Sequence, residues 1–312
     1  MDTAGGSGQT DYPCMGGHMY KYKFALNTNF FKSYTRPEIV ECALKAGLDG
    51  IEWGLPDIDH AKTAAKEMKA VTSGTGLEIV SYINGGHLWK TDVIRRWSEA
   101  VVLGEGKILR VAHPWLGWNL DECMRTKETF KELFSKARTG LEKLDDLHRE
   151  FGIRYVLEIH RGSVASSAAV CAQLMDGLDP ATVGIIYDPA NSITEGFIRP
   201  RSAVELLGPY LSYVHAKNII FRYSGAFVPG KLKRLAYETL VCAPQCGMLD
   251  WVEVFFALKL AGYSGWISLE EFFKGKTIEE NAAEIKEAVS FLKEAADEAK
   301  DGLTEPFLKL NE

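Results

Sequence analysis

Four short apolar segments in the second half of the chain are each followed by side chains that bind metals or transfer protons. These side chains are Glu158 with His160, Asp188 with Asn191, His215 with Lys217, and Glu270 with Glu271. Two glutamates, an aspartate and a histidine are a ligand set for a divalent cation, with hard oxygens favouring Mn²⁺, Co²⁺ or Mg²⁺ and Zn²⁺ left open. Three carboxylates at one place would repel each other without such a cation.

Each of these residues also has an ordinary structural interpretation. A carboxylate at the end of a strand often caps the next helix or pairs with a lysine or arginine. The metal hypothesis therefore depends on Glu158, Asp188, His215 and Glu270 together. They must lie at the ends of successive strands, at the same level along the strand direction.

The elements that must position these residues alternate between short apolar runs and longer amphipathic ones, which is typical of repeated strand-helix units. The strands are expected at 22–26, 50–53, 78–83, 108–112, 155–159, 183–187, 211–214 and 266–269. Helices are expected from Thr35 to Gly47, at 127–150 and at 278–300. Eight units over roughly 290 residues average about 36 residues each, which predicts an α/β fold, a closed (β/α)8 TIM barrel.

An open doubly wound sheet is the alternative architecture. It would favour a glycine fingerprint between its first strand and helix, and no glycine cluster of this chain has that position and spacing. The phosphate-binding pattern GxxxxGK[ST] is also absent from the sequence, so we expect no nucleotide cofactor. In a barrel, catalytic groups come from the carboxyl ends of the strands, where the four candidate ligands stand.

The composition of the 312 residues is globular, with 46% hydrophobic and 25% charged residues and a net charge of −6. A negative chain does not favour nucleic acid as a partner. The sequence has no apolar run of about 18 to 20 residues and no basic, apolar leader, so we expect a cytoplasmic protein without a membrane span. We interpret 1–20 as a flexible arm and 21–312 as one barrel domain.

A long connection at about 221–248 stands out within that domain. It carries Arg222, Lys231, Lys233 and Arg234 against one acid, Glu238, so we predict a lid that holds an anionic group. The alternative is a solvated loop or an oligomer contact. For Cys242 and Cys246, a disulfide or two packed thiols is favoured over a metal site.

Further residues are candidates for contacting a substrate. His160 and Lys217 each lie two residues after a candidate ligand and so on the same face of the strand. The others are Glu52, His113, Trp115 and Asn191. For each, an ion pair, a core position or packing under a loop is the structural alternative.

Five segments resemble the sugar isomerase/epimerase family of xylose isomerase-like barrels, in the superfamily of AP endonuclease family 2. They are AGLDGIEW at 46–53, LEIH at 157–160, YDPAN at 187–191, VHAKN at 214–218 and GYSGWISLEEF at 262–272. The resemblance implies that Glu158, Asp188, His215 and Glu270 are the metal ligands. Glu271 is expected on the other side of its strand.

The same superfamily holds endonuclease IV, from which this chain departs. The trinuclear zinc cluster of that enzyme implies a histidine where Asn191 stands and an Asp-x-His motif after His215, which is missing. Together with the negative charge, this disfavours DNA repair.

The leading hypothesis is a divalent-metal-dependent isomerase or epimerase of a sugar or sugar phosphate. A proton next to a carbonyl would be removed through a metal-stabilised enediolate, with Glu158 and Glu270 as catalytic acid and base. One alternative is a dehydratase of the inosose or 3-dehydroshikimate type, and another is a catalytically silent sugar-binding barrel. The expected partner is a small sugar or polyol, with a homo-oligomer as an open alternative.

Overall fold

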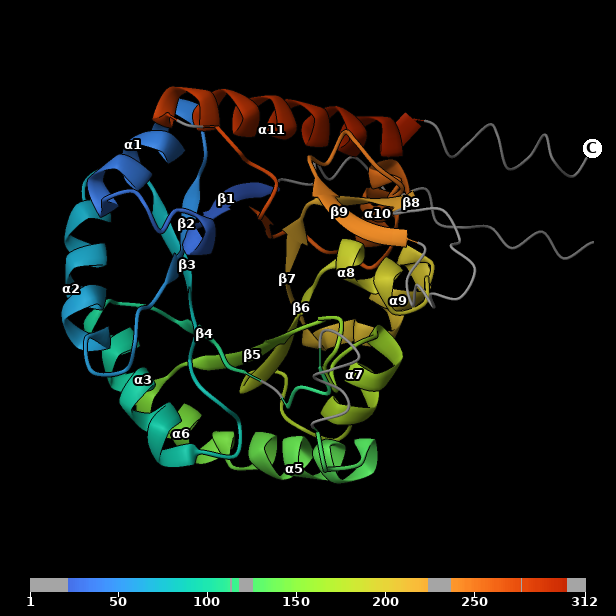
Figure 1. The fold of residues 1–312 in the computed structure, drawn as a ribbon. Helices are drawn as coiled ribbons and strands as arrows, with labels where there is room; N and C mark the ends of the chain where they lie inside the picture. The colour runs from blue at the N-terminus through green and yellow to red at the C-terminus, as the bar shows by residue number, and fades with distance from the viewer. Residues whose placement is uncertain (1–21, 113, 118–125, 224–236, 276, 302–312) are drawn as a thin grey trace, which may run out of the picture.

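In the computed structural model, which describes residues 22–112, 114–117, 126–223, 237–275 and 277–301, eight parallel strands close into a barrel. Their order around the barrel is β1-β10-β7-β6-β5-β4-β3-β2, and helices surround them (Figure 1). The strands are β1 Lys23–Asn27, β2 Gly50–Gly54, β3 Glu78–Ile83, β4 Ile108–Arg110, β5 Arg154–Glu158, β6 Val183–Tyr187, β7 Leu211–Ala216 and β10 Trp266–Leu269. The predicted barrel is confirmed.

The outer layer consists of helices that follow the strands in sequence. They are α1 Arg36–Ala46, α2 Ala61–Thr72, α3 Thr91–Leu103, α5 Phe130–Glu142, α6 Leu144–Phe151, α7 Ala168–Met175, α8 Pro189–Thr194, α9 Pro200–Leu207, α10 Trp251–Leu260 and α11 Ile278–Asp301. The last helix packs against both α1 and α10, which joins the two ends of the ring (Figure 1). No described helix is both long and apolar enough to cross a membrane.

Local sequence signals set the helix ends. Thr35 and Glu38 form a capping box at the start of α1, and Gly47 ends that helix at φ 72°, as expected. The single helix predicted at 127–150 is wrong, because the chain forms α5 and α6 with Lys143 between them. Lys143 keeps nearly helical angles, φ −79° and ψ −12°, so the two segments bury their leucines on one continuous face.

The barrel interior is layered. Val156, Ile186 and Tyr213 form an apolar cluster inside the barrel, separate from the main core between the strands and the helices. Because side chains alternate along a strand, the residues two positions later face the same interior near the carboxyl ends. Those residues are Glu158, Asp188 and His215.

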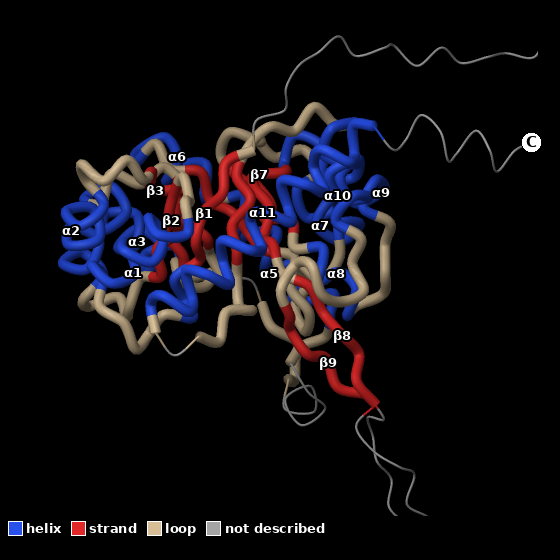
Figure 2. Tube along the Cα trace, turned by 90° about the horizontal axis from the view of Figure 1, so that it is seen from above, coloured by secondary structure: helices blue, strands red, loops and turns tan. Residues whose placement is uncertain are grey.

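The connection predicted at 221–248 begins and ends in an antiparallel ribbon. Strand β8 (Asn218–Tyr223) pairs with β9 (Tyr237–Cys242), and the ribbon projects from the barrel (Figure 2). The expectation of a long loop is therefore wrong for residues 221–223 and 237–242, which are strand, whereas 243–248 lie outside the ribbon. Arg222 is paired across the ribbon with Glu238, Nη2 to Oε1 2.6 Å.

Three further predictions concern this connection and the amino-terminal arm: the lid, the flexible arm and the state of Cys242 and Cys246. Lys231, Lys233 and Arg234 lie outside the described residues, as do residues 1–20, so the lid and the arm stay predictions. Cys242 and Cys246 are free thiols, and Sγ of Cys242 donates to the carbonyl of Cys246 at 2.8 Å. The disulfide alternative is wrong for this structure.

Candidate metal centre

Glu158, Asp188, His215 and Glu270 meet inside the carboxyl end of the barrel. One ligand atom from each lies within 4.8 Å of the others, and all four residues are buried. They come from the last residue of β5, the residue after β6, the body of β7 and the residue after β10. Barrel closure places these strands side by side in the order β10-β7-β6-β5.

The donor set fits a divalent cation. Three carboxylates and one imidazole are ligands that Mn²⁺, Co²⁺, Mg²⁺ and Zn²⁺ accept. Oε2 of Glu158 is buried and pairs with Nη1 of Arg110 at 2.8 Å. Glu158, Asp188 and Glu270 are all buried, and three carboxylates this close repel one another unless cations compensate them.

Asn191 holds two of these carboxylates in place. Its Nδ2 donates to Oδ2 of Asp188 at 2.7 Å and to Oε1 of Glu158 at 3.2 Å. Its backbone N–H donates to Oδ1 of Asp188 at 2.8 Å, so Asp188 also caps α8. Asp188 therefore acts as a helix cap, and its place in the cluster leaves it available as a metal ligand as well.

A buried lysine and a half-buried arginine border the cluster. Nζ of Lys217 lies 3.0 Å from Oδ2 of Asp188 and 2.9 Å from Oε2 of Glu270. Arg110, at the end of β4, pairs with Glu158 and was missed by the sequence analysis. An arginine inside an apolar strand was the available signal, because such a charge is rarely buried without a partner.

Glu271 corrects one expectation. Its φ of 71° turns the chain after β10, so its side chain does not point to the far side of the strand. Oε2 of Glu271 lies 3.1 Å from Nζ of Lys217, beside the same pocket as Glu270. Glu270 belongs to the cluster of four, and Glu271 is linked to it through Lys217.

Glu52 lies beneath the cluster, fully buried. Its carboxylate faces Nε2 of His215, with Oε2 at 3.1 Å, and accepts from the hydroxyls of Ser268 at 2.8 Å and Ser81 at 3.1 Å. The hydroxyl of Tyr213 donates to it as well. Glu52 was expected to contact a substrate, but it does not line the pocket above the cluster.

The two nitrogens of His215 therefore face different partners. Nδ1 lies 3.2 Å from Oε1 of Glu158 and 3.1 Å from Oε2 of Glu270. Nε2 faces Glu52 on the other edge of the ring. A proton on Nε2, donated to Glu52, would leave the Nδ1 lone pair directed at the cluster.

Burial and neighbouring charges shift the pKa values of the cluster residues in different directions. Burial raises the pKa of Asp188 to about 6, against the opposing charge of Lys217. For Glu270, burial is outweighed by His215 and Lys217, which lower the pKa to about 2. The pKa of His215 is raised well above its usual range, because the surrounding glutamates outweigh the effect of burial.

A cavity of about 260 Å³ opens above the cluster. Its wall includes His160 and Trp115, whose rings meet edge to face with centroids 5.1 Å apart. The wall also includes Asn191 and Lys217, so their role as substrate contacts stays a prediction. His113 lies outside the described residues.

Several residues around the cluster were not anticipated. Nδ2 of Asn27 donates to Oε1 of Glu270 at 3.2 Å. Asn27 ends β1, which pairs with β10 although the two strands lie at opposite ends of the sequence. Tyr213 and Ser268 each lie two residues before a candidate ligand, and this spacing was the signal that could have found them.

Comparison with known proteins matches residues 40–295 to the model of the xylose isomerase-like TIM barrel family. An inosose dehydratase of Lacticaseibacillus casei is 27% identical over 139 residues, 44% of this chain and 46% of that protein. An inosose dehydratase of Geobacillus kaustophilus is 30% identical over 139 residues, 42% of this chain and 43% of that protein. The chain thus spans under half the length of these relatives.

Solved structures resemble the barrel over most of its length. A 3-keto-D-glucoside 4-epimerase from E. coli has a TM-score of 0.66 at 18% identity, covering 88% of this chain and 100% of that chain. A D-psicose 3-epimerase from Clostridium cellulolyticum H10, solved with D-tagatose, has a TM-score of 0.64 at 16% identity, covering 88% and 99%. The IOLI protein, solved with a zinc atom, has a TM-score of 0.66 at 16% identity, covering 88% and 99%. At these identities the likeness shows the fold alone.

Proposed function

The chain belongs to the xylose isomerase-like TIM barrel family, and on this premise we propose that it is a divalent-metal-dependent isomerase or epimerase of a sugar or sugar phosphate. The observation that carries the proposal is the buried cluster of Glu158, Asp188, His215 and Glu270 below an open cavity. The four would hold one divalent cation, which when bound supplies Lewis-acid polarisation of a carbonyl.

Glu158 and Glu270 are the proposed acid and base. They come from β5 and β10, which are separated around the barrel by β6 and β7, so they approach a bound sugar from different sides. One removes a proton from the carbon next to the carbonyl and the other returns a proton. Arg110 holds Glu158, and Asn27 with Lys217 holds Glu270, so both carboxylates are oriented before a substrate enters.

The cavity wall supplies groups for orienting a substrate. Lys217 and Arg110 place cationic donors beside the cluster, where an oxygen that gains negative charge would be stabilised. Trp115 and His160 form an aromatic side of the wall, against which the C–H face of a sugar can pack. Asn191 adds an amide that borders both the cavity and two of the ligands.

Glu52 is proposed as a positioning residue instead of a substrate contact. Its carboxylate fixes the imidazole of His215 from below, as buried carboxylates do for metal-bound histidines in general. The hydroxyls of Tyr213, Ser81 and Ser268 in turn hold Glu52.

A dehydratase is the second candidate, favoured by the two relatives described above, which are both inosose dehydratases. The reaction begins with the same proton removal and continues with loss of a hydroxyl from the next carbon. The same side chains would serve both reactions, so the product decides between them.

The test is to incubate the metal-loaded protein with a panel of ketoses and keto-polyols in D₂O and follow them by NMR. An isomerase or epimerase incorporates deuterium next to the carbonyl and yields an isomer of equal mass apart from the label. A dehydratase yields an unsaturated or deoxy product that has lost water. Binding of sugars and metal with no exchange and no product would refute both and leave the silent sugar-binding barrel.

A further inference from the structure

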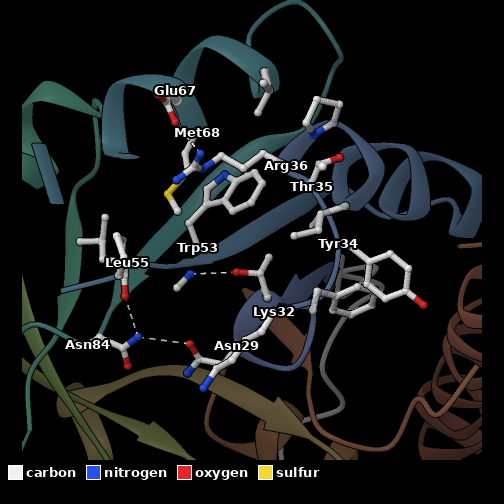
Figure 3. Close-up of a pocket in the computed structure, with 17 residues that line it drawn as sticks. Asn29, Lys32, Tyr34, Thr35, Arg36, Trp53, Leu55, Glu67, Met68 and Asn84 are labelled. Atoms are coloured by element: carbon white, nitrogen blue, oxygen red, sulfur yellow. Dashed lines mark hydrogen bonds and ion pairs between the residues drawn. The ribbon is translucent and has the colours of Figure 1, made fainter. Parts of the chain in front are cut away.

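A second cavity, of about 670 Å³, has none of the four cluster residues in its wall. Figure 3 shows the side chains that line it. It is walled by the connection from β1 to α1, by residues 54–56 after β2, by helix α2 and by Asn84 after β3. Its volume falls in the range of small-molecule sites. The proposed reaction does not use this cavity.

A single turn of chain separates the two cavities. The 3₁₀ turn η1 (Thr28–Phe30) follows β1, and Asn27 caps it while its side chain contacts Glu270. Phe30 lines the cavity above the cluster, Thr28 lines the second cavity, and Asn29 lines both. Three residues of 3₁₀ helix are about 6 Å long, which makes the ridge about as broad as one sugar ring.

The top of this ridge is aromatic and open. Phe30 is 46% exposed, which is unusual for a phenylalanine beside a polar site. A sugar that crosses the ridge would place its C–H face against this ring.

Hydrogen-bonding atoms on the wall of the second cavity remain available. Nδ2 of Asn84 donates to the carbonyl of Leu55 at 2.9 Å and to Oδ1 of Asn29 at 3.3 Å, as Figure 3 shows. The Leu55 carbonyl fixes which way the Asn84 amide points, which leaves Oδ1 of Asn84 and Nδ2 of Asn29 without partners among the described residues.

The backbone at Asn84 and at Gly54 has a geometry that few residue types permit. Asn84 has a φ of 81°, a left-handed conformation that few side chains adopt. A Cβ at Gly54 would lie 2.5 Å from Oδ1 of Asn29, so only glycine permits this position of the amide. Strained positions of this kind persist where the surrounding structure requires them.

The available atoms suit a hydroxylated ligand. They comprise a donor on Asn29 and an acceptor on Asn84, and a hydroxyl both donates and accepts. Lys32 adds an ammonium group to the same wall. The charge of Arg36 is already paired with Glu67. The floor is apolar, with the buried Trp53 held by a hydrogen bond from Nε1 to Thr72 Oγ1 at 3.1 Å.

We propose that the second cavity binds the neighbouring sugar ring of a glycosidic substrate, whose reacting ring lies over the cluster of Glu158, Asp188, His215 and Glu270. The inference rests on the proposed function and narrows its substrate to a disaccharide or glycoside. The linkage between the rings crosses η1, with Phe30 on one side and the Asn29 amide on the other.

The experiment compares fructose with turanose, isomaltulose and lactulose, three disaccharides that each end in a fructose unit. Their binding to the metal-loaded protein is measured by calorimetry, and deuterium exchange in D₂O is measured in parallel. At least one disaccharide should bind about tenfold more tightly than fructose, the equivalent of about 1.4 kcal/mol. Asn84→Gly keeps the left-handed backbone, removes the amide, and should abolish that advantage while leaving fructose unchanged.

The matched control is Glu105→Gly, which makes the same kind of substitution at another left-handed residue, φ 57°, outside both cavities. It should leave all four affinities as in the parent. If no disaccharide binds better than fructose, or if Asn84→Gly weakens fructose equally, the subsite is refuted. Absence of exchange with intact, Asn84-dependent binding of a disaccharide would refute the proposed reaction and leave the subsite standing.

Discussion

Nε2 of His215 lies 3.1 Å from Oε2 of Glu52, while Nδ1 of the same ring lies 3.2 Å from Oε1 of Glu158. One imidazole thus joins a carboxylate buried beneath the site to a carboxylate inside the cluster. This arrangement orients the ring and selects the nitrogen that faces a cation.

Glu52→Gln is expected to lower the affinity for Mn²⁺ by about 10- to 100-fold, because an amide orients and polarises the His215 ring less well than a carboxylate. Calorimetric titration measures the affinity, and ¹⁵N NMR of the imidazole reports the tautomer. Ser81→Ala removes one donor to Glu52 and should have a smaller effect. An unchanged metal affinity with a raised KM would return Glu52 to the role of a substrate contact.

Removal of the cation should destabilise the fold, because Glu158, Asp188 and Glu270 then face each other without it. At a metal concentration 100 times Kd, linkage predicts about 2.7 kcal/mol of stabilisation that chelation removes. Thermal unfolding followed by circular dichroism, with and without EDTA, measures this. Asp188→Asn should stay folded and lose the response to added metal. Identical melting of the chelated and loaded parent would contradict a metal site.

Metal affinity should rise with pH. In the metal-free protein, burial raises the pKa of Asp188 to about 6, and the glutamates raise the pKa of His215. Both groups therefore hold protons that a cation must displace, and fewer protons remain as the pH increases above 6. Calorimetry at pH 5.5 to 8 in buffers of different ionisation enthalpy would count the protons released. An affinity that falls over this interval would oppose the assignment of these ligands.

Glu270→Gln should abolish proton transfer on one side of the substrate. We expect the metal-loaded variant to lose at least about 100-fold in deuterium exchange, the lower range for a positioned acid or base. Glu271→Gln is the matched control, because its carboxylate also pairs with Lys217 but does not belong to the cluster. If Glu270→Gln exchanges deuterium at the parental rate, another group transfers the proton, and His160 and Lys217 are the next candidates.

The strand ends could be predicted from the sequence because alternation and chain spacing are local properties. Short apolar runs ending in Glu158, Asp188, His215 and Glu270 place these residues at one rim of any closed parallel barrel. The same local pattern could not show where the helix at 127–150 divides, nor that the chain after 217 forms a ribbon. Those features depend on packing partners elsewhere in the chain.

Contacts across the barrel were decided by the tertiary structure alone. Glu52 and His215 are 163 residues apart, and Asn27 and Glu270 are 243 residues apart. Their meeting depends on closure of the barrel and on the register of β1 with β2 and β10. No local pattern encodes that register, because a strand identifies its buried face but not the side chain that it will meet on the opposite strand. The polar network around His215 and the second cavity beside η1 follow from that closure.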